Sequence, residues 1–168
     1  VEFLKCVLAG VCRHHLDDGE CLVWSGLSWV PGKLPPPLRE PHRPMVCVSW
    51  SQAENYCFYK GKRLPTEAEW ELSARGTANF KYPWGNSPKA DCAHVVMSEN
   101  TLDPDQMGCG AQGTLPIGSR PDGKSPFGAE DMVGNAWEWV YDWYQYNYYE
   151  TSSGTDPQGP DAGYQKVV

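Results

Sequence analysis

Apolar residues recur at helical spacing near the start of the chain, with polar residues between them. The apolar positions are Phe3, Leu4, Val7 and Leu8. Residues three and four apart share one face of an α-helix, so these side chains form a single apolar stripe. Gly10 follows as a residue suited to end the helix. The pattern predicts an amphipathic helix up to Gly10.

Capping boxes predict two further helices, each with a Ser or Thr at its start and a Glu three residues later. The pairs are Ser51 with Glu54 and Thr66 with Glu69. Glycine ends each pattern, at Gly61 and at Gly76. In this interpretation the Glu69 side chain bonds to the backbone at the start of its helix. We therefore expect Glu69 to be structural rather than catalytic.

Beyond Gly76 the pattern changes to that of turns and short strands, with a last short helix or turn near residues 134–143. The closing letters YQKVV are typical of the start of a strand. The chain opens without a methionine, in what resembles the middle of a helix. A length of 168 residues suits one domain. We expect a single domain over residues 1–168, truncated at both ends.

Composition indicates an irregular, loop-rich fold. The chain has 17 glycines and 15 prolines, while eight tryptophans and nine tyrosines imply an aromatic interior. These counts favour a fold with few regular elements, and the helix and strand patterns above make its class α+β. The net charge of −7, without a basic stripe, argues against a nucleic-acid partner. No apolar run approaches the roughly 18 residues of a transmembrane segment.

The seven cysteines indicate an oxidising compartment. They are Cys6, Cys12, Cys21, Cys47, Cys57, Cys92 and Cys109. No C-x-x-C pair occurs, which argues against a zinc ribbon or a thioredoxin-like centre. The spacings suit disulfides and hence a periplasmic, cell-surface or secreted protein, although scattered buried thiols are the alternative. Because seven is odd, one cysteine has no partner within the chain.

Candidate chemistry gathers in DMVGNAWEWVYDW, residues 131–143, where Glu138 lies between two tryptophans. Such a segment can do chemistry, hold an ion, or form an aromatic core around one acid. A weaker metal candidate is His14-His15 with Asp17-Asp18, since paired histidines in a polar loop are more often solvated. The aromatic run WYQYNYYE suits either stacking on a sugar or partner, or closing the core.

Four separated motifs resemble the formylglycine-generating enzyme, or sulfatase-modifying factor, family. They lie in the stretches VCVSWSQAENYCFYKGKRLPTEAEWELSARG, YPWGN and GTLPIGSRPDGKSPFGAEDMVGNAWEWVYDWY, within residues 46–144. The extra cysteines resemble a secreted bacterial branch. The resemblance implies a loop-dominated fold of the C-type-lectin-like kind, which agrees with the composition.

The resemblance also implies an activity: active family members oxidise a sulfatase cysteine to formylglycine, using copper held by two cysteine thiolates. Those cysteines lie in a carboxyl-terminal segment, and no cysteine follows Cys109 here. We therefore expect a non-catalytic, lectin-like binding scaffold outside the cytoplasm, whose partner is another protein or a missing carboxyl-terminal segment. The alternative is a fragment of the copper-dependent oxidase. An iron-dependent sulfur-chemistry branch is less favoured, because its histidine-bearing helical domain is absent.

In the family the Val-Gly-Asn-Ala-Trp-Glu segment wraps a calcium ion, a hard cation that needs six to eight oxygen ligands. The implied ligands are the backbone carbonyls of Val133, Gly134 or Asn135, and Ala136, together with the Glu138 carboxylate. The flanking tryptophans are expected to bury the ion. The alternative is that Glu138 only accepts hydrogen bonds from nearby amides or indoles.

A second calcium site of some family members is altered here, with His94 and Cys109 at its ligand positions. The resemblance implies a Cys92–Cys109 disulfide in place of the ion, which stabilises the fold by about 3 kcal/mol in the loop-entropy model. Among the three pairings open to the four remaining amino-terminal cysteines, we expect Cys12–Cys21 and Cys6–Cys47. The family pattern implies that Cys57 bonds to a cysteine outside this chain.

Overall fold

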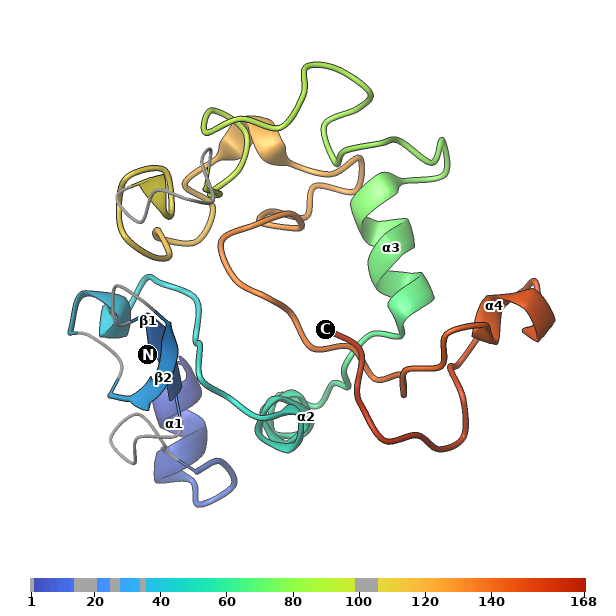
Figure 1. Ribbon diagram of the computed structural model, residues 1–168. Coiled ribbons are helices and arrows are strands. Elements are labelled where there is room, and N and C mark those ends of the chain that lie inside the picture. Colours follow the sequence, from blue (N-terminus) through green and yellow to red (C-terminus); the bar gives the residue numbers. More distant parts are fainter. Residues whose placement is uncertain (1, 14–20, 25–27, 34–35, 99–105) are drawn as a thin grey trace.

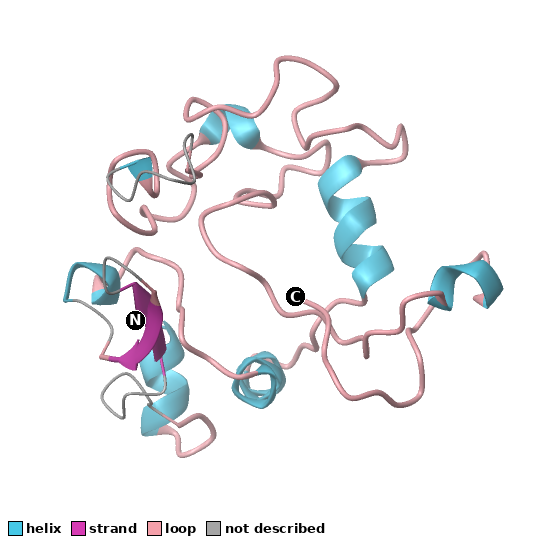
Figure 2. Cartoon of the chain, in the orientation of Figure 1, coloured by secondary structure: helices cyan, strands magenta, loops and turns pink. Residues whose placement is uncertain are grey.

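The computed structural model describes residues 2–13, 21–24, 28–33, 36–98 and 106–168. Most of the chain is loop, as Figure 2 shows. The elements, with η for 3-10 helices, are α1 (Glu2–Leu8), β1 (Cys21–Trp24), β2 (Trp29–Gly32), η1 (Pro36–Arg39), α2 (Trp50–Tyr59), α3 (Glu67–Arg75), η3 (Pro121–Gly123) and α4 (Tyr148–Thr151). Residues 134–143 form turns and bends rather than a helix. None of the described helices is long and apolar enough to cross a membrane.

The amino-terminal part gathers α1, β1 and β2 on one side of the molecule, while α3 and α4 lie on the other (Figure 1). The two strands pair antiparallel, with Cys21 opposite Gly32. On α1, Phe3 and Cys6 are buried, whereas Leu4 and Leu8 are exposed, so the helix is present but only part of the predicted apolar stripe faces the protein interior. The Phe3 ring packs on Tyr56 of α2, with 5.7 Å between ring centroids. This contact docks α1 on α2.

A capping box begins α2, but at a position two residues earlier than expected. The Ser49 hydroxyl accepts a hydrogen bond from the Gln52 amide, and the Gln52 side chain accepts one from the Ser49 amide. The predicted box of Ser51 with Glu54 is therefore wrong. Ser-x-x-Gln is also a capping box, and it is chosen here because the Gln52 side chain is buried whereas Ser51 is exposed.

The capping box at the start of α3 is the predicted one. Thr66 is buried and accepts from the Glu69 amide, while the Glu69 carboxylate accepts from the Thr66 amide at 2.8 Å. Arg63 donates two further hydrogen bonds to that carboxylate, each 2.7 Å long. The Arg63 guanidinium and the Thr66 amide together lower the pKa of Glu69 to about 2. Glu69 is thus a structural anion, as the sequence predicts.

Two tryptophan side chains form hydrogen bonds between the start of α2 and the segment that follows Glu138. The indole of Trp50 donates to the carbonyl of Val140 at 2.7 Å, and the indole of Trp139 donates to the carbonyl of Val48 at 2.9 Å. The two bonds run in opposite directions between the same two segments. They fix the backbone immediately after Glu138 and so help to position its side chain.

Candidate functional site

The turn at residues 133–136 is held in place by one asparagine. The Asn135 side chain accepts from the amide of Leu115 at 2.8 Å and donates to its carbonyl at 3.2 Å. The Asn135 amide donates to the carbonyl of Val96 at 2.8 Å. Gly134 has φ of +75°, and a Cβ there would lie 2.3 Å from the Val96 carbonyl oxygen. Glycine is therefore required at this close approach of two backbones.

Backbone carbonyls of this turn remain available as ligands. The Gly134 carbonyl accepts from the Ala136 amide at 2.7 Å. Those of Val133, Asn135 and Ala136 accept no hydrogen bond from any residue that the structure describes. Carbonyl oxygens are hard donors with two lone pairs, so the turn offers the ligand type that calcium prefers.

Glu138 follows this turn, and an indole from α3 holds one of its oxygens. Trp70 donates to the Glu138 carboxylate at 2.6 Å, which is the kind of bond expected if Glu138 bound no ion. The second carboxylate oxygen accepts from none of the described residues. Much of the residue is exposed, yet its carboxyl end lies among protein atoms that remove water from it. This desolvation, reinforced by the negative charge of Asp131, raises the pKa of Glu138.

Asp131 is a site residue that the sequence reasoning missed. It lines the same pocket as Glu138, and one of its oxygens accepts from the Gly118 amide at 2.8 Å while the other is left without a partner among the described residues. The pocket has a volume of about 280 Å³ and is lined by Pro44, Ile117, Glu130, Asp131, Asn135, Ala136 and Glu138. No lining residue is basic, and Glu130 already pairs with Lys124 at 2.9 Å. The sequence could have indicated Asp131, because it lies in the quoted DMVGNAWEW segment, two residues before the turn at residues 133–136.

The tryptophans beside Glu138 do not bury the site, contrary to expectation. The Trp137 side chain is 85% exposed, and the Trp139 indole points to Val48 instead. The aromatic side chain that contacts the Glu138 carboxylate is Trp70, which is distant in sequence and donates a hydrogen bond to it. Alternation along an extended segment explains the error, because neighbouring side chains point to opposite sides.

The amino-terminal disulfides differ from the expected pairing. The structure joins Cys6 to Cys12 and Cys21 to Cys47, so the pairings Cys12–Cys21 and Cys6–Cys47 are wrong. The chain turns back directly after α1, and the Cys12 amide donates to the Cys6 carbonyl, which brings the two Cα atoms within 5.2 Å. Cys21 and Cys47 likewise lie 5.2 Å apart between Cα atoms. A local turn therefore selects the Cys6–Cys12 pair, whereas the Cys21–Cys47 pair joins residues that are 26 positions apart in the sequence.

The third disulfide joins Cys92 to Cys109, with 5.7 Å between Cα atoms, as the sequence analysis expected. The Cys109 amide also donates to the Met97 carbonyl at 2.7 Å. Cys57 remains a free, half-buried thiol, and burial raises its pKa. Its bond to a cysteine outside the chain stays a prediction.

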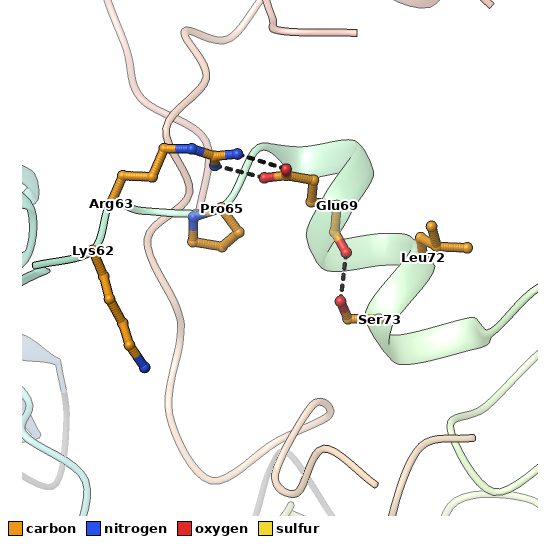
Figure 3. A pocket seen from close by; sticks show the side chains of 6 residues that line it. All are labelled: Lys62, Arg63, Pro65, Glu69, Leu72 and Ser73. Carbon is orange, nitrogen blue, oxygen red and sulfur yellow. Dashed lines mark hydrogen bonds and ion pairs between the residues drawn. The ribbon is translucent and has the colours of Figure 1, made fainter. Parts of the chain in front are cut away.

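A wider, open pocket lies beside the start of α3 (Figure 3). Its lining residues are Lys62, Arg63, Pro65, Glu69, Leu72 and Ser73. Figure 3 shows Arg63 turned toward Glu69, and Ser73 bonded to the Glu69 carbonyl. Arg63 and Glu69 already form an ion pair in this pocket. It therefore has fewer unpaired charged groups available to a ligand than the pocket at Glu138.

The other candidates from the sequence add no second site. His14-His15 with Asp17-Asp18 lies outside the described residues. Within the described ranges, no group of three or more His, Cys, Asp or Glu side chains is arranged to hold a metal ion. The aromatic run around residues 143–150 leaves Tyr144 and Tyr146 exposed, while Tyr149 donates to Glu67 at 3.0 Å. A metal ion bound by the described residues therefore needs backbone oxygens among its ligands, and the turn before Glu138 supplies such oxygens.

Comparison with known proteins identifies the family. The sulfatase-modifying factor enzyme 1-like domain matches residues 7–167. The chain is 39% identical over 135 residues to the formylglycine-generating enzyme of Thermomonospora curvata, covering 76% of this chain and 44% of that protein. It is 40% identical over 103 residues to the inactive C-alpha-formylglycine-generating enzyme 2 of Bos taurus, covering 61% of this chain and 34% of that protein.

A solved structure shares the fold. PvdO from Pseudomonas aeruginosa superposes with a TM-score of 0.65 and 25% identity, over 95% of this chain and 59% of that chain. The chain spans less than half the length of the two relatives named above. The family domain, by contrast, covers the chain almost from end to end. The motifs, the loop-rich fold and these matches together place the chain in the sulfatase-modifying factor family, whose members include the formylglycine-generating enzymes.

Proposed function

We propose that this chain is a calcium-stabilised, non-catalytic binding scaffold with a C-type-lectin-like fold, working outside the cytoplasm. The observation that supports it most is the pocket at Asp131 and Glu138. Each of these carboxylates has one oxygen held by a hydrogen bond and one oxygen without a partner among the described residues. Two negative groups that share a pocket without a lining cation favour a bound cation.

Calcium suits these ligands better than a soft metal. The free donors are two carboxylate oxygens and the carbonyls of Asn135 and Ala136, whose residues line the pocket, together with the carbonyl of Val133 in the same turn. All of them are hard oxygen atoms. Flexible coordination by carboxylates, carbonyls and water is typical of calcium. A bound divalent cation would also favour the ionised form of Glu138, whose pKa is raised by desolvation and by Asp131. Ion binding would thereby offset the cost of holding this charge in the pocket.

A binding role rests on the state of the cysteines. Six of them form disulfides, and the thiol of Cys57 has a raised pKa. Thiolates, not thiols, bind copper and attack substrates, so these residues are suited to stability rather than redox chemistry. Disulfides on this scale also fit an oxidising compartment. The inactive relative from Bos taurus has the same kind of domain, so membership of the family is compatible with a non-catalytic role.

The second candidate is a part of a formylglycine-generating oxidase, supported by the similarity to the enzyme of Thermomonospora curvata. Copper would then need a pair of thiolates in addition to the residues described here, from a further segment of the protein. In that case the calcium turn keeps the same structural role. The partner of the scaffold is either another protein or such a segment.

The calcium site is tested by isothermal titration calorimetry on the protein as it is naturally produced. We expect the wild type to bind calcium, and Glu138→Gln and Asp131→Asn each to lose most of the affinity. Glu130→Gln is the matched control, because Glu130 lines the pocket but pairs with Lys124. Equal affinity in Glu138→Gln and Glu130→Gln, or the absence of calcium binding by the wild type, contradicts the site.

The absence of catalysis is tested by incubating the same protein with a sulfatase-type cysteine peptide, copper and oxygen. We expect the peptide mass to stay unchanged. Formation of the aldehyde product would replace the scaffold proposal by the oxidase alternative, and it would leave the calcium proposal standing.

A further inference from the structure

The last residues of the chain pair with the segment that follows Glu138. Residue Lys166 forms an antiparallel bridge with Trp143. On either side of it, the Tyr144 amide donates to Gln165 at 2.8 Å, and the Val167 amide donates to the carbonyl of Asp142 at 3.1 Å. The carboxyl end consequently lies toward the middle of the molecule in Figure 1.

The Lys166 ammonium lies inside a group of three aromatic rings, which we name the aromatic cage: Trp50, Tyr141 and Trp143. Its nitrogen is 3.9 Å from the ring centroid of Trp50, 3.9 Å from that of Trp143 and 5.2 Å from that of Tyr141. A cation within about 6 Å of an aromatic centroid is attracted by the ring quadrupole. The ammonium also donates to the Tyr141 carbonyl at 2.8 Å.

Carboxylates do not hold this ammonium. No ion pair among the described residues includes Lys166, although Glu54 and Asp142 are near enough to favour its charge. Desolvation by the surrounding groups lowers the pKa of Lys166 despite these two acids. The aromatic rings and one carbonyl are therefore its direct partners.

The cage is fixed by contacts that do not involve Lys166. The Trp50 indole donates to Val140, and its ring contacts Tyr141 with 6.1 Å between centroids. A Cβ at Gly163 would lie 2.9 Å from the Cβ of Trp143, so the backbone packs closely on that side chain. Rings held in advance lose little conformational freedom when they bind a cation.

We propose that Trp50, Tyr141 and Trp143 form an alkylammonium-binding site, and that this site selects an extended strand carrying a lysine in register with Trp143. In this chain Lys166 is the bound lysine. Backbone pairing with residues 140–144 provides the general affinity, and the cage provides the side-chain specificity. The site is separate from the calcium pocket and does not depend on the role proposed for it.

Chemical complementation tests this site in the protein as it is naturally produced. Lys166→Ala removes three carbons and the ammonium, which n-propylammonium can replace. We expect Lys166→Ala to lower the melting temperature by about 4–8 °C, since contacts to a partly desolvated ammonium are lost. Propylammonium should then raise the melting temperature of this variant in a saturable manner, and leave the wild type unchanged because its cage is filled.

The controls separate charge from size and site. 1-Propanol at the same concentration should have a smaller effect than propylammonium, and sodium chloride should reproduce none of the rescue. The double variant Lys166→Ala/Trp143→Leu should not be rescued. Equal rescue by propanol, rescue of the double variant, or no rescue of Lys166→Ala overturns the proposal.

A second variant keeps the test open if Lys166→Ala does not fold. Lys166→Met retains an unbranched apolar side chain and the strand pairing but lacks the charge. We expect it to melt below both the wild type and Lys166→Arg, whose guanidinium also binds aromatic faces. A Lys166→Met variant as stable as the wild type shows that the cage only packs against the aliphatic stem, which overturns the proposal.

Discussion

The start of α3 and the turn before Glu138 each hold a glutamate against nearby hydrogen-bond donors, with opposite results. Glu69 accepts two bonds from Arg63 and one from the Thr66 amide, and its pKa falls to about 2. Glu138 accepts one bond from Trp70, is desolvated and lies near Asp131, so its pKa is raised. The first carboxylate is satisfied as an anion, and the second is not.

The difference separates a structural acid from a binding acid. A protein that already supplies a guanidinium leaves nothing for an external cation to neutralise. A protein that desolvates one carboxylate beside a second negative charge leaves a site where a cation gains interaction energy. The two regions are also joined, because Trp70 is part of α3 and its indole reaches Glu138. The rigid capped helix therefore serves as a platform for the less satisfied acid.

The largest expected effect is that of calcium removal. A ligand present at one hundred times its Kd stabilises the native state by about 2.7 kcal/mol. We expect a chelator to lower the melting temperature of the wild type accordingly, as measured by scanning calorimetry. Glu138→Gln should show no such response, while Glu69→Gln should respond like the wild type. If the chelator does not change the melting temperature of the wild type, Glu138 does not bind calcium, and the proposed difference between Glu138 and Glu69 is wrong.

Loss of the α3 cap comes next. Thr66→Ala removes the hydroxyl that accepts from the Glu69 amide, and we expect it to cost about 1–2 kcal/mol of unfolding free energy in urea titrations. Thr77→Ala is the matched control, because Thr77 is exposed and follows the end of the helix. The same loss should appear with and without calcium. If Thr66→Ala lowers the free energy of unfolding by less than Thr77→Ala does, the cap does not have this structural role.

The pH dependence of Glu138 should be visible once calcium is absent. Because its folded pKa is raised above the unfolded value, protonated Glu138 favours folding, and this contribution is lost as pH rises through the folded pKa. Glu138→Gln should therefore be the more stable protein at neutral pH in calcium-free buffer, by about 0.5 kcal/mol given the exposure of the residue. With calcium the order should reverse. Thermal melts over a pH series, compared with Glu130→Gln, check both signs.

Glu69 should show a pH effect no larger than that of Glu138, with the opposite sign. Its folded pKa of about 2 is below the unfolded value of 4.5, so its contribution is complete above pH 4.5 and is lost as pH falls toward 2. The side chain is 37% exposed, so screening keeps the contribution to about 0.5 kcal/mol. Glu69→Gln should flatten this acid limb in urea titrations. If Glu69→Gln loses as much stability at acid pH as the wild type does, other acidic residues cause that loss.

Local patterns allowed a good part of the molecule to be predicted. The Thr66–Glu69 box is correct because both partners lie within one helical turn, where backbone geometry determines their distance. The helix α1 and the loop-rich fold follow from hydrophobic spacing and from the glycine and proline content, although two of the four apolar positions predicted to be buried on α1 are exposed. The family motifs indicated the Cys92–Cys109 bond and the turn that ends at Glu138.

Tertiary contacts decided what the local patterns left open. Ser49 rather than Ser51 caps α2 because burial of Gln52 selected one of two overlapping boxes. Cys6 met Cys12 because the chain turned back after α1, a choice that counting cysteines does not reveal. The choice of the α2 cap and the choice of the disulfide partner both depend on the path of the backbone, which the residue types alone do not determine.

The candidate site shows the same division. The local sequence supplies the glycine-containing turn and Glu138, whereas the indole that donates to the Glu138 carboxylate belongs to Trp70, which lies 68 residues earlier. Asp131 joins the pocket through a backbone with φ of +56°, a conformation that its residue type permits but does not require. Electrostatic shifts depend on distances between groups far apart in the chain. The sequence by itself thus determined which acids are present, and only the tertiary structure decided which of them lacks a cation.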